Sequence, residues 1–228
     1  MSRSIVSLSG GMDSSTVAFY AAQHSDIEMA VNFSYGSKHN EYERSAAKKI
    51  AEHLGIWLRY VDLPFTEWGC GTDSALMKQG GDIPEGHYEA ESMSQTVVPG
   101  RNLIMSSILA SIAETVGAQQ IYLGVHSGDH VIYPDCRPEF VEALDKTVKT
   151  STDGKCVVVS PYLRGDKTSI IKDGLTMGVP YKDTRTCYKD QGIACGKCGS
   201  CQERLEAFKA NGIEDPIEYE TRTILAKE

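Results

Sequence analysis

The sequence predicts an α/β fold: an open parallel sheet with helices on both faces. Short apolar runs alternate with segments of helical periodicity from residue 5 to residue 177, and this alternation is typical of strands joined by crossover helices. A glycine loop directly follows the first apolar run, where such folds bind ligands. The 228 residues suffice for a large buried core. We expect one domain over 1–228, with an insertion at 64–96 and a metal-binding C-terminal segment at 187–212.

Each element rests on a local pattern. The expected strands are residues 5–8, 28–33, 57–63, 121–125 and 157–159. The expected helices are residues 14–23, 41–54, 102–115, 139–149, 166–177 and 202–210. Gly55, Gly117 and Gly178 stand where these helices should end, because glycine readily adopts the left-handed conformation of a C-cap. Asp166 is an expected N-cap. From Asp215 the chain has the character of a loosely held tail.

The segment 64–96 interrupts the alternation of strands and helices. It is rich in Gly, Asp, Glu, Ser and Pro, and its helical pattern is short. A loop of this length in a compact domain is usually functional or disordered. We expect an excursion over the carboxyl edge of the sheet that serves as a lid.

Composition narrows the class of protein. The formal net charge is −8, which disfavours a large nucleic-acid footprint. No stretch is long and apolar enough to span a bilayer, and no signal peptide is recognisable, so a cytoplasmic location is expected. Seven cysteines are present, an odd number that argues against a disulfide framework.

The glycine loop reads Ser9-Gly10-Gly11-Met12-Asp13-Ser14. Two glycines permit a sharp turn and close approach to a ligand, and the following helix N-terminus favours an anion. The loop predicts a phosphate cradle, with Asp13 available to hold Mg²⁺ on a nucleotide; a plain glycine turn with Asp13 as helix N-cap is the alternative. The expected ATP-binding residues are Leu8, Ser9, Gly10, Gly11, Met12, Asp13, Ser14, Ser15, Thr16, Val17, Ala18 and Lys167.

Four cysteines fall within fifteen residues. Cys187, Cys195, Cys198 and Cys201 are spaced C-x7-C-x2-C-x2-C. Four thiolates without a spare ligand predict a closed, structural zinc site. An iron–sulfur cluster is a less favoured alternative, and unrelated free cysteines are a third.

Polar residues gather in loops that topology places around the same cleft. Arg101 and Asn102 open a helix, where Arg101 could bind phosphate or carboxylate; a surface ion pair is the alternative. Lys167 starts a helix, a position that suits a cation only when an anion is nearby, so we expect a triphosphate contact unless it faces solvent. Asp135 could accept N–H groups of a guanine-like edge and Arg137 could bind a carboxylate, although the stretch could equally be a turn. His39, His126 and His130 lie in loops directed to this cleft.

These strings together resemble one family. The glycine loop has the signature of the PP-loop ATP pyrophosphatases, of the adenine nucleotide alpha-hydrolase-like fold. With this loop and further motifs, the sequence resembles the 7-cyano-7-deazaguanine synthase (QueC) family over nearly the whole chain. The further motifs are Tyr35-Gly36, Lys38-His39, Val98-Pro99-Gly100-Arg101-Asn102, Tyr133-Pro134-Asp135-Cys136-Arg137, Asp166-Lys167 and the four clustered cysteines.

The resemblance implies an ATP-dependent ligase of queuosine- and archaeosine-type biosynthesis. Such an enzyme converts 7-carboxy-7-deazaguanine and ammonia to the 7-cyano product through an activated carboxylate and an amide. It implies zinc, Mg²⁺ with ATP, and a homodimer. Arg101, Lys167 and Asp13 become the expected catalytic residues. The expected substrate-binding residues are Lys38, His39, Arg101, Asn102, Tyr133, Asp135 and Arg137.

Other functions stay open at this stage. The stretch 124–132 differs from the usual family pattern, so an enzyme that stops at the amide, or joins the acid to another amine in a DNA-modification or defence pathway, is an alternative. A PP-loop enzyme acting on tRNA is less favoured, because no basic face is visible. A zinc-knuckle nucleic-acid-binding module would need basic and aromatic residues around the cysteines.

Overall fold

A computed structural model describes residues 1–225, apart from the side chain of His130. Five parallel strands form one sheet: β1 (Arg3–Ser7), β2 (Asp26–Ser34), β3 (Leu58–Asp62), β4 (Gln120–Tyr122) and β5 (Val157–Val159). Their spatial order is β3-β2-β1-β4-β5, so the order reverses between β1 and β4. The predicted fold class is confirmed.

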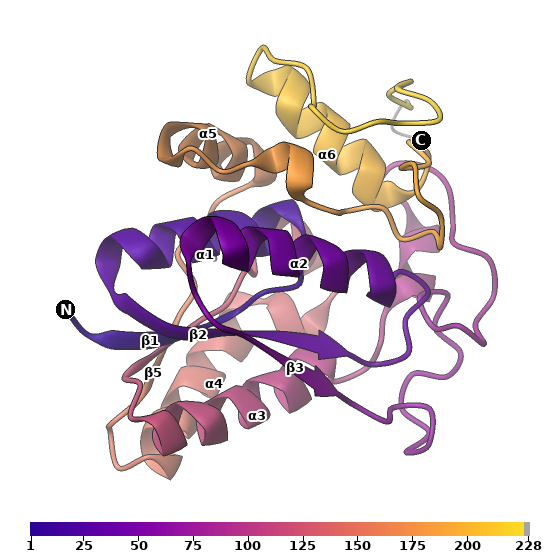
Figure 1. Cartoon of the computed structure of the whole chain (residues 1–228). Coiled ribbons are helices and arrows are strands. Elements are labelled where there is room, and N and C mark those ends of the chain that lie inside the picture. Colours follow the sequence, from indigo (N-terminus) through magenta and orange to yellow (C-terminus); the bar gives the residue numbers. More distant parts are fainter. Residues whose placement is uncertain (226–228) are drawn as a thin grey trace.

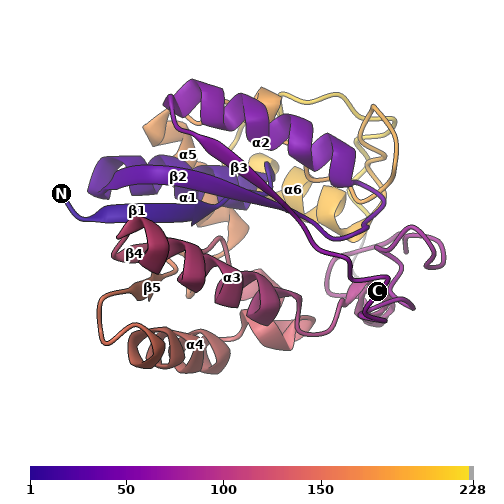
Figure 2. The ribbon, with the colours of Figure 1, turned by 60° about the horizontal axis from the view of Figure 1, so that its bottom comes forward.

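Helices cover both faces of the sheet. On one face lie α1 (Met12–His24) and α2 (Asn40–Leu54), and on the other α3 (Arg101–Val116) and α4 (Pro138–Ser151) (Figures 1 and 2). The helices α5 (Lys167–Met177) and α6 (Gly199–Ala210) form an outer layer above α1 (Figure 1). Short 3-10 helices span Glu91–Thr96, Ser127–Val131, Pro134–Cys136 and Tyr181–Asp183. Within residues 1–225, no helix combines the length and the apolar character that crossing a membrane requires.

The helix ends follow the predicted capping chemistry. Gly55, Gly117 and Gly178 all adopt the left-handed conformation at C-caps. The side chain of Asp166 accepts a hydrogen bond from the Ser169 amide and caps α5. The first helix differs from the prediction: α1 begins at Met12 with Gly11 as N-cap. Asp13 therefore lies in the first turn, and its carboxylate is not a cap.

The insertion is a packed layer at the carboxyl ends of the strands, where Figure 2 shows it beyond β3. Phe65, Leu76, Met77 and Met93 are fully buried, and Met77 forms an isolated bridge with Ser37. Its side chains extend the core formed with β2 and α3. The insertion is therefore packed against the core over part of its length, and its role as a lid stays a prediction.

The segment after Asp215 is firmly attached up to residue 225, which contradicts the predicted loose tail. Asp215 is buried and forms an ion pair with Arg204 of α6, with 2.6 Å between Oδ2 and Nε. Backbone bonds join Ala194 to Glu218 and Glu220. A buried charge pair escaped the prediction because its two members are eleven residues apart and no local pattern marks them. The rest of the predicted tail, residues 226–228, lies outside the described residues.

Candidate active site

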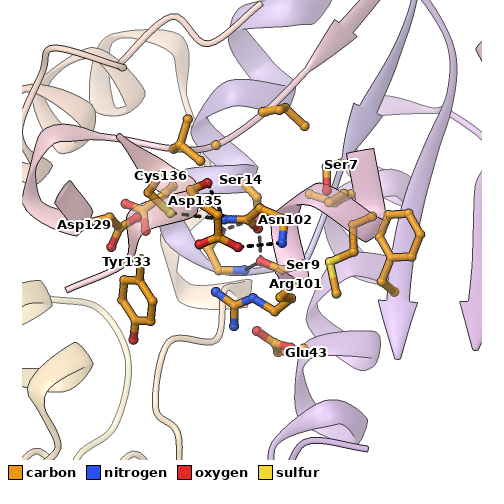
Figure 3. Close-up of a pocket in the computed structure, with 18 of the residues that line it drawn as sticks. Ser7, Ser9, Ser14, Glu43, Arg101, Asn102, Asp129, Tyr133, Asp135 and Cys136 are labelled. Atoms are coloured by element: carbon orange, nitrogen blue, oxygen red, sulfur yellow. Dashed lines mark hydrogen bonds between the residues drawn. The ribbon is translucent and has the colours of Figure 1, made fainter. Parts of the chain in front are cut away.

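A cleft opens where the strand order reverses. Ser7 to Ser9, at the end of β1, and Leu123 to Val125, after β4, line its floor. This is where open α/β sheets bind ligands. The free space in this cleft is about 1240 Å³, a volume that includes space open to solvent. Figure 3 shows side chains from both halves of the chain meeting in this space.

The glycine loop forms one end of the cleft. The Ser9 hydroxyl lies 2.9 Å from that of Ser14 and accepts the Gly11 amide at 3.2 Å. Gly10 has a φ of +87°, and a Cβ on it would lie 2.4 Å from the Ala47 nitrogen of α2. The sequence therefore needs glycine here for two separate reasons. The turn brings the N-terminus of α1, with its unpaired amides, to the cleft.

Lys167 connects the glycine loop to α6. Its Nζ lies 2.6 Å from Oε2 of Glu203 and 3.5 Å from Oδ2 of Asp13, and the side chain is 6% exposed. Burial alone would lower the pKa of Lys167, but the carboxylates of Asp13 and Glu203 raise it above its ordinary value. Lys167 is therefore a permanent cation. The other oxygen of Asp13, Oδ1, is buried without a hydrogen-bond partner in the described part of the chain.

His126 and Asp129 complete the charge cluster at this end. The buried His126 places Nε2 3.4 Å from Oδ2 of Asp129 and 3.8 Å from Oδ2 of Asp13. Its Nδ1 accepts the Gly128 amide, so Nε2 carries the proton and points at the carboxylates. Burial would raise the pKa of Asp129, but His126, Lys167 and a 2.6 Å hydrogen bond from the Tyr88 hydroxyl lower it.

Arg101 dominates the opposite end. It is the first residue of α3, and its guanidinium donates to the Tyr35 hydroxyl at 3.1 Å. It lies 5.7 Å from the ring centroids of both Tyr35 and Tyr133. Aromatic rings hold a cation in place without neutralising it. Arg101 is therefore positioned to receive a carboxylate.

Asn102 and Asp135 form a connected pair beside Arg101. The Asp135 carboxylate accepts the Asn102 backbone amide at 2.9 Å, and the Asn102 side chain donates to the Asp135 carbonyl at 3.1 Å and to the Cys136 sulfur at 3.1 Å (Figure 3). These bonds fix the start of α3 against the Pro134–Cys136 helix. These hydrogen bonds explain why the Arg101-Asn102 motif and the Asp135-Cys136 motif, which are far apart in the sequence, lie at the same cleft.

Three residues of this end were not anticipated. In α2, Oε2 of Glu43 lies 3.7 Å from Nε2 of His39. Arg185 donates to the carbonyls of Lys189, Gln191 and Gly192, and its own amide binds the Gly10 carbonyl. Tyr188 packs its ring 5.4 Å from that of His39. The four-residue spacing of His39 and Glu43 at a helix start was the one available signal, because it places both on one face.

The structure brings most predicted residues to the cleft. Those lining it are Leu8, Ser9, Gly11, Asp13, Ser14, His39, Arg101, Asn102, Tyr133, Asp135 and Lys167. Gly10 supports the loop from behind. Met12, Ser15, Thr16, Val17 and Ala18 are buried beneath it, since they follow Gly11 on the inner turns of α1. The side chains of these neighbours thus serve the packing of α1 and do not line the cleft.

Two predicted substrate residues lie elsewhere. The Lys38 ammonium donates to backbone carbonyls of Ala75, Gly80 and Gly81 and so anchors the insertion. Arg137 is exposed at the N-cap of α4. Neither Lys38 nor Arg137 lines the cleft. The chain turns near each of them, so that nearby residues such as His39 and Asp135 line the cleft instead. The side chain of His130 is outside the described residues.

The four cysteines meet in one buried cluster. The sulfurs of Cys187, Cys195, Cys198 and Cys201 all lie within 4.8 Å of one another. Amides of Lys197 and Cys198 donate to the Cys195 sulfur at 3.4 and 3.3 Å, as expected of thiolates in a metal knuckle. Four convergent sulfurs with amide support fit a tetrahedral metal site.

Comparison with known proteins agrees with this geometry. The sequence model described as "Queuosine biosynthesis protein QueC" matches residues 3–212. The chain belongs to the QueC family. It is 47% identical over 221 residues to the 7-cyano-7-deazaguanine synthase of Psychromonas ingrahamii, covering 96% of this chain and 99% of the relative. It is 44% identical to that of Caldicellulosiruptor saccharolyticus, covering 96% of each chain. The predicted family resemblance is thereby confirmed.

Proposed function

We propose that this QueC-family enzyme converts 7-carboxy-7-deazaguanine and ammonia to 7-cyano-7-deazaguanine with ATP. The observation that carries the proposal is one cleft lined by residues of both the glycine loop and the start of α3, including Ser9, Asp13 and Arg101. The family's curated members bear the name of this reaction.

ATP would bind along the glycine loop. The amides at the start of α1 and the Ser9 and Ser14 hydroxyls are donors for phosphate oxygens, and Phe33, Met105 and Leu109 form an apolar wall suited to the adenine ring. Lys167 would stabilise the charge that develops on the departing pyrophosphate. Asp13 would hold Mg²⁺ on the nucleotide, which fits its buried, unpartnered Oδ1.

The deazapurine acid would bind at the other end. Arg101 offers a bidentate donor to the 7-carboxylate, and Tyr35 and Tyr133 supply flat surfaces beside it. Asp135 lies in position to accept N–H groups of the guanine-like edge. Arg137, being exposed outside the cleft, has no part in this assignment.

The chemistry consists of two activations at the same carbon. A carboxylate oxygen attacks the α-phosphorus of ATP, pyrophosphate leaves, and the acyl adenylate forms. Ammonia attacks the acyl carbon, AMP leaves with the oxygen, and the amide remains. The amide oxygen is then adenylated in turn, and loss of AMP and of two protons from nitrogen gives the nitrile. The protein positions the reactants and excludes water.

The remaining assignments complete the proposal. The four cysteines would bind Zn²⁺ as a structural ion, since all four ligand positions are used. Ammonia is the proposed nitrogen source. We also propose a homodimer and a cytoplasmic location, in keeping with the soluble substrates.

The test is incubation of the purified protein with ATP, Mg²⁺, ammonium and 7-carboxy-7-deazaguanine. We expect the nitrile as the final mass, with AMP and pyrophosphate as nucleotide products. Accumulation of the amide with ammonium in excess, or a requirement for a different amine, would transfer the enzyme to the amide-forming alternative. Release of ADP would contradict the cleavage expected of the glycine loop.

A further inference from the structure

Glu43 lines the same cleft as the glycine loop and Arg101, and the proposed chemistry gives it no role. It belongs to the first turn of α2. Its backbone carbonyl packs against Gly10, while its side chain lines the cleft and is 19% exposed. In Figure 3 its carboxylate lies beside the Arg101 guanidinium and near Ser9.

The surroundings of Glu43 leave both the ionised and the protonated form of its carboxyl group populated near neutral pH. Burial raises the pKa of Glu43 to about 7, against the opposing effect of Arg101 and Arg185. The groups that face it are Arg101 from α3, Arg185 from the segment before the cysteines, and His39 and Tyr35 from the loop after β2. Burial also lowers the pKa of His39 to about 3, so His39 is neutral. Glu43 can therefore exchange a proton near physiological pH.

The proposed function creates a need for such a group. Ammonium must lose a proton before nitrogen can attack, the C–N adduct loses another as AMP leaves, and the second round removes two more from the same nitrogen. Each proton is released within reach of the reacting carbon. A base with a pKa near the working pH is best suited to this task.

We propose that Glu43 is the base that takes these protons from nitrogen. In the first round the Glu43 carboxylate accepts a proton from nitrogen as the C–N bond forms and the C–O bond to AMP breaks. In the second round it accepts a proton from nitrogen as the C–N bond becomes a triple bond and the C–O bond to AMP breaks. The protonated Glu43 then returns the proton to solvent through the open side of the cleft. This assignment rests on the proposed function, because it needs a nitrogen nucleophile and an acyl adenylate.

The test compares Glu43→Gln with a matched control, Glu41→Gln, whose carboxylate is exposed in the same helical turn. Activation is followed by pyrophosphate release with the acid and ATP alone, and nitrogen transfer by amide and nitrile formation with ammonium. Hydroxylamine, largely unprotonated at neutral pH, serves as a second nucleophile. We expect E43Q to retain activation, to lose about 10²–10⁴-fold in the ammonium reaction, and to lose far less with hydroxylamine. E41Q should resemble the unaltered protein.

Three results would overturn the assignment. Equal losses with ammonium and hydroxylamine would mean that Glu43 orients the substrate and moves no proton. Loss of pyrophosphate release in E43Q would place Glu43 in the activation step. If the unaltered protein releases no pyrophosphate with the deazapurine acid, the proposed function itself fails. The activation assay thus separates failure of the function from failure of the base.

Discussion

The two ends of the cleft manage their cations in opposite ways. At the nucleotide end, Lys167 already has the carboxylates of Asp13 and Glu203 within 3.5 Å. At the substrate end, Arg101 has tyrosine rings and a hydroxyl around it, and the neighbouring Glu43 has a raised pKa. A ligand at the first end must displace an existing partner, whereas a ligand at the second supplies a missing one. Under the proposed function, this difference assigns the triphosphate to the Lys167 end and the substrate carboxylate to the Arg101 end.

The largest expected effect comes from breaking the structure that supports both ends at once. Cys198→Ser, or removal of metal by a strong chelator, should abolish activity and expose residues 187–225 to protease. Structural zinc contributes on the order of 10–16 kcal/mol in small zinc domains, and α6 carries Glu203 to the nucleotide end while the segment before it carries Arg185 and Tyr188 to the other. Metal content by mass spectrometry and limited proteolysis measure the result. Full activity of a metal-free protein would contradict it, and Cys156→Ser, outside the cluster, is the control.

The next effect separates the two ends. Arg101→Ala should raise the KM for the deazapurine acid about 10²–10³-fold, by analogy with loss of a charged donor in an active site, with a smaller change for ATP. Lys167→Ala should mainly impair pyrophosphate release. Steady-state kinetics with each substrate varied in turn provide the measurement, with Arg137→Ala as a control expected to change little. If both variants affected both substrates alike, the division of the cleft would be incorrect.

A smaller effect is expected from the proposed replacement of Glu203 by the triphosphate as the ionic partner of Lys167. Glu203→Gln removes the charge that competes with a triphosphate for the lysine but keeps the shape of the side chain. The hydrogen bond to a charged group weakens by roughly 1 kcal/mol, so the KM for ATP should fall by about 3–10-fold while the KM for the acid stays unchanged. An increase in the KM for ATP would mean that Glu203 holds Lys167 in its active position.

The same contrast explains what the sequence could predict. The glycine loop consists of consecutive residues 9–14, and the four clustered cysteines fall within fifteen positions, so local spacing was enough to single out each of them. The Arg101 end combines residues from the loop after β2, from α2, from α3 and from the segment before the cysteines, and only the fold brings them together. Lys38 and Glu43 illustrate the limit. They are five residues apart, yet the start of α2 at Asn40 directs Lys38 to the insertion and Glu43 into the cleft.

The smallest effect is on stability, and its sign follows from the pKa of Glu43. The folded-state pKa of about 7 is above the ordinary value of 4.5, so folding favours the protonated form. The stabilising contribution is complete at pH below 4.5 and is lost as the pH rises through 7. Glu43→Gln, which never ionises, should therefore raise the Tm by up to about 7–14 °C at pH 8 and change the Tm little at pH 4.5. Calorimetry at both pH values checks this, with Glu41→Gln as the control. A destabilised E43Q at pH 8 would mean that the ionised Glu43 is held by Arg101 and Arg185 more strongly than burial opposes it. The two Tm measurements thus decide whether, in the protein without ligand, the ion pairing of Glu43 with Arg101 and Arg185 is too weak to offset the cost of burying the Glu43 charge.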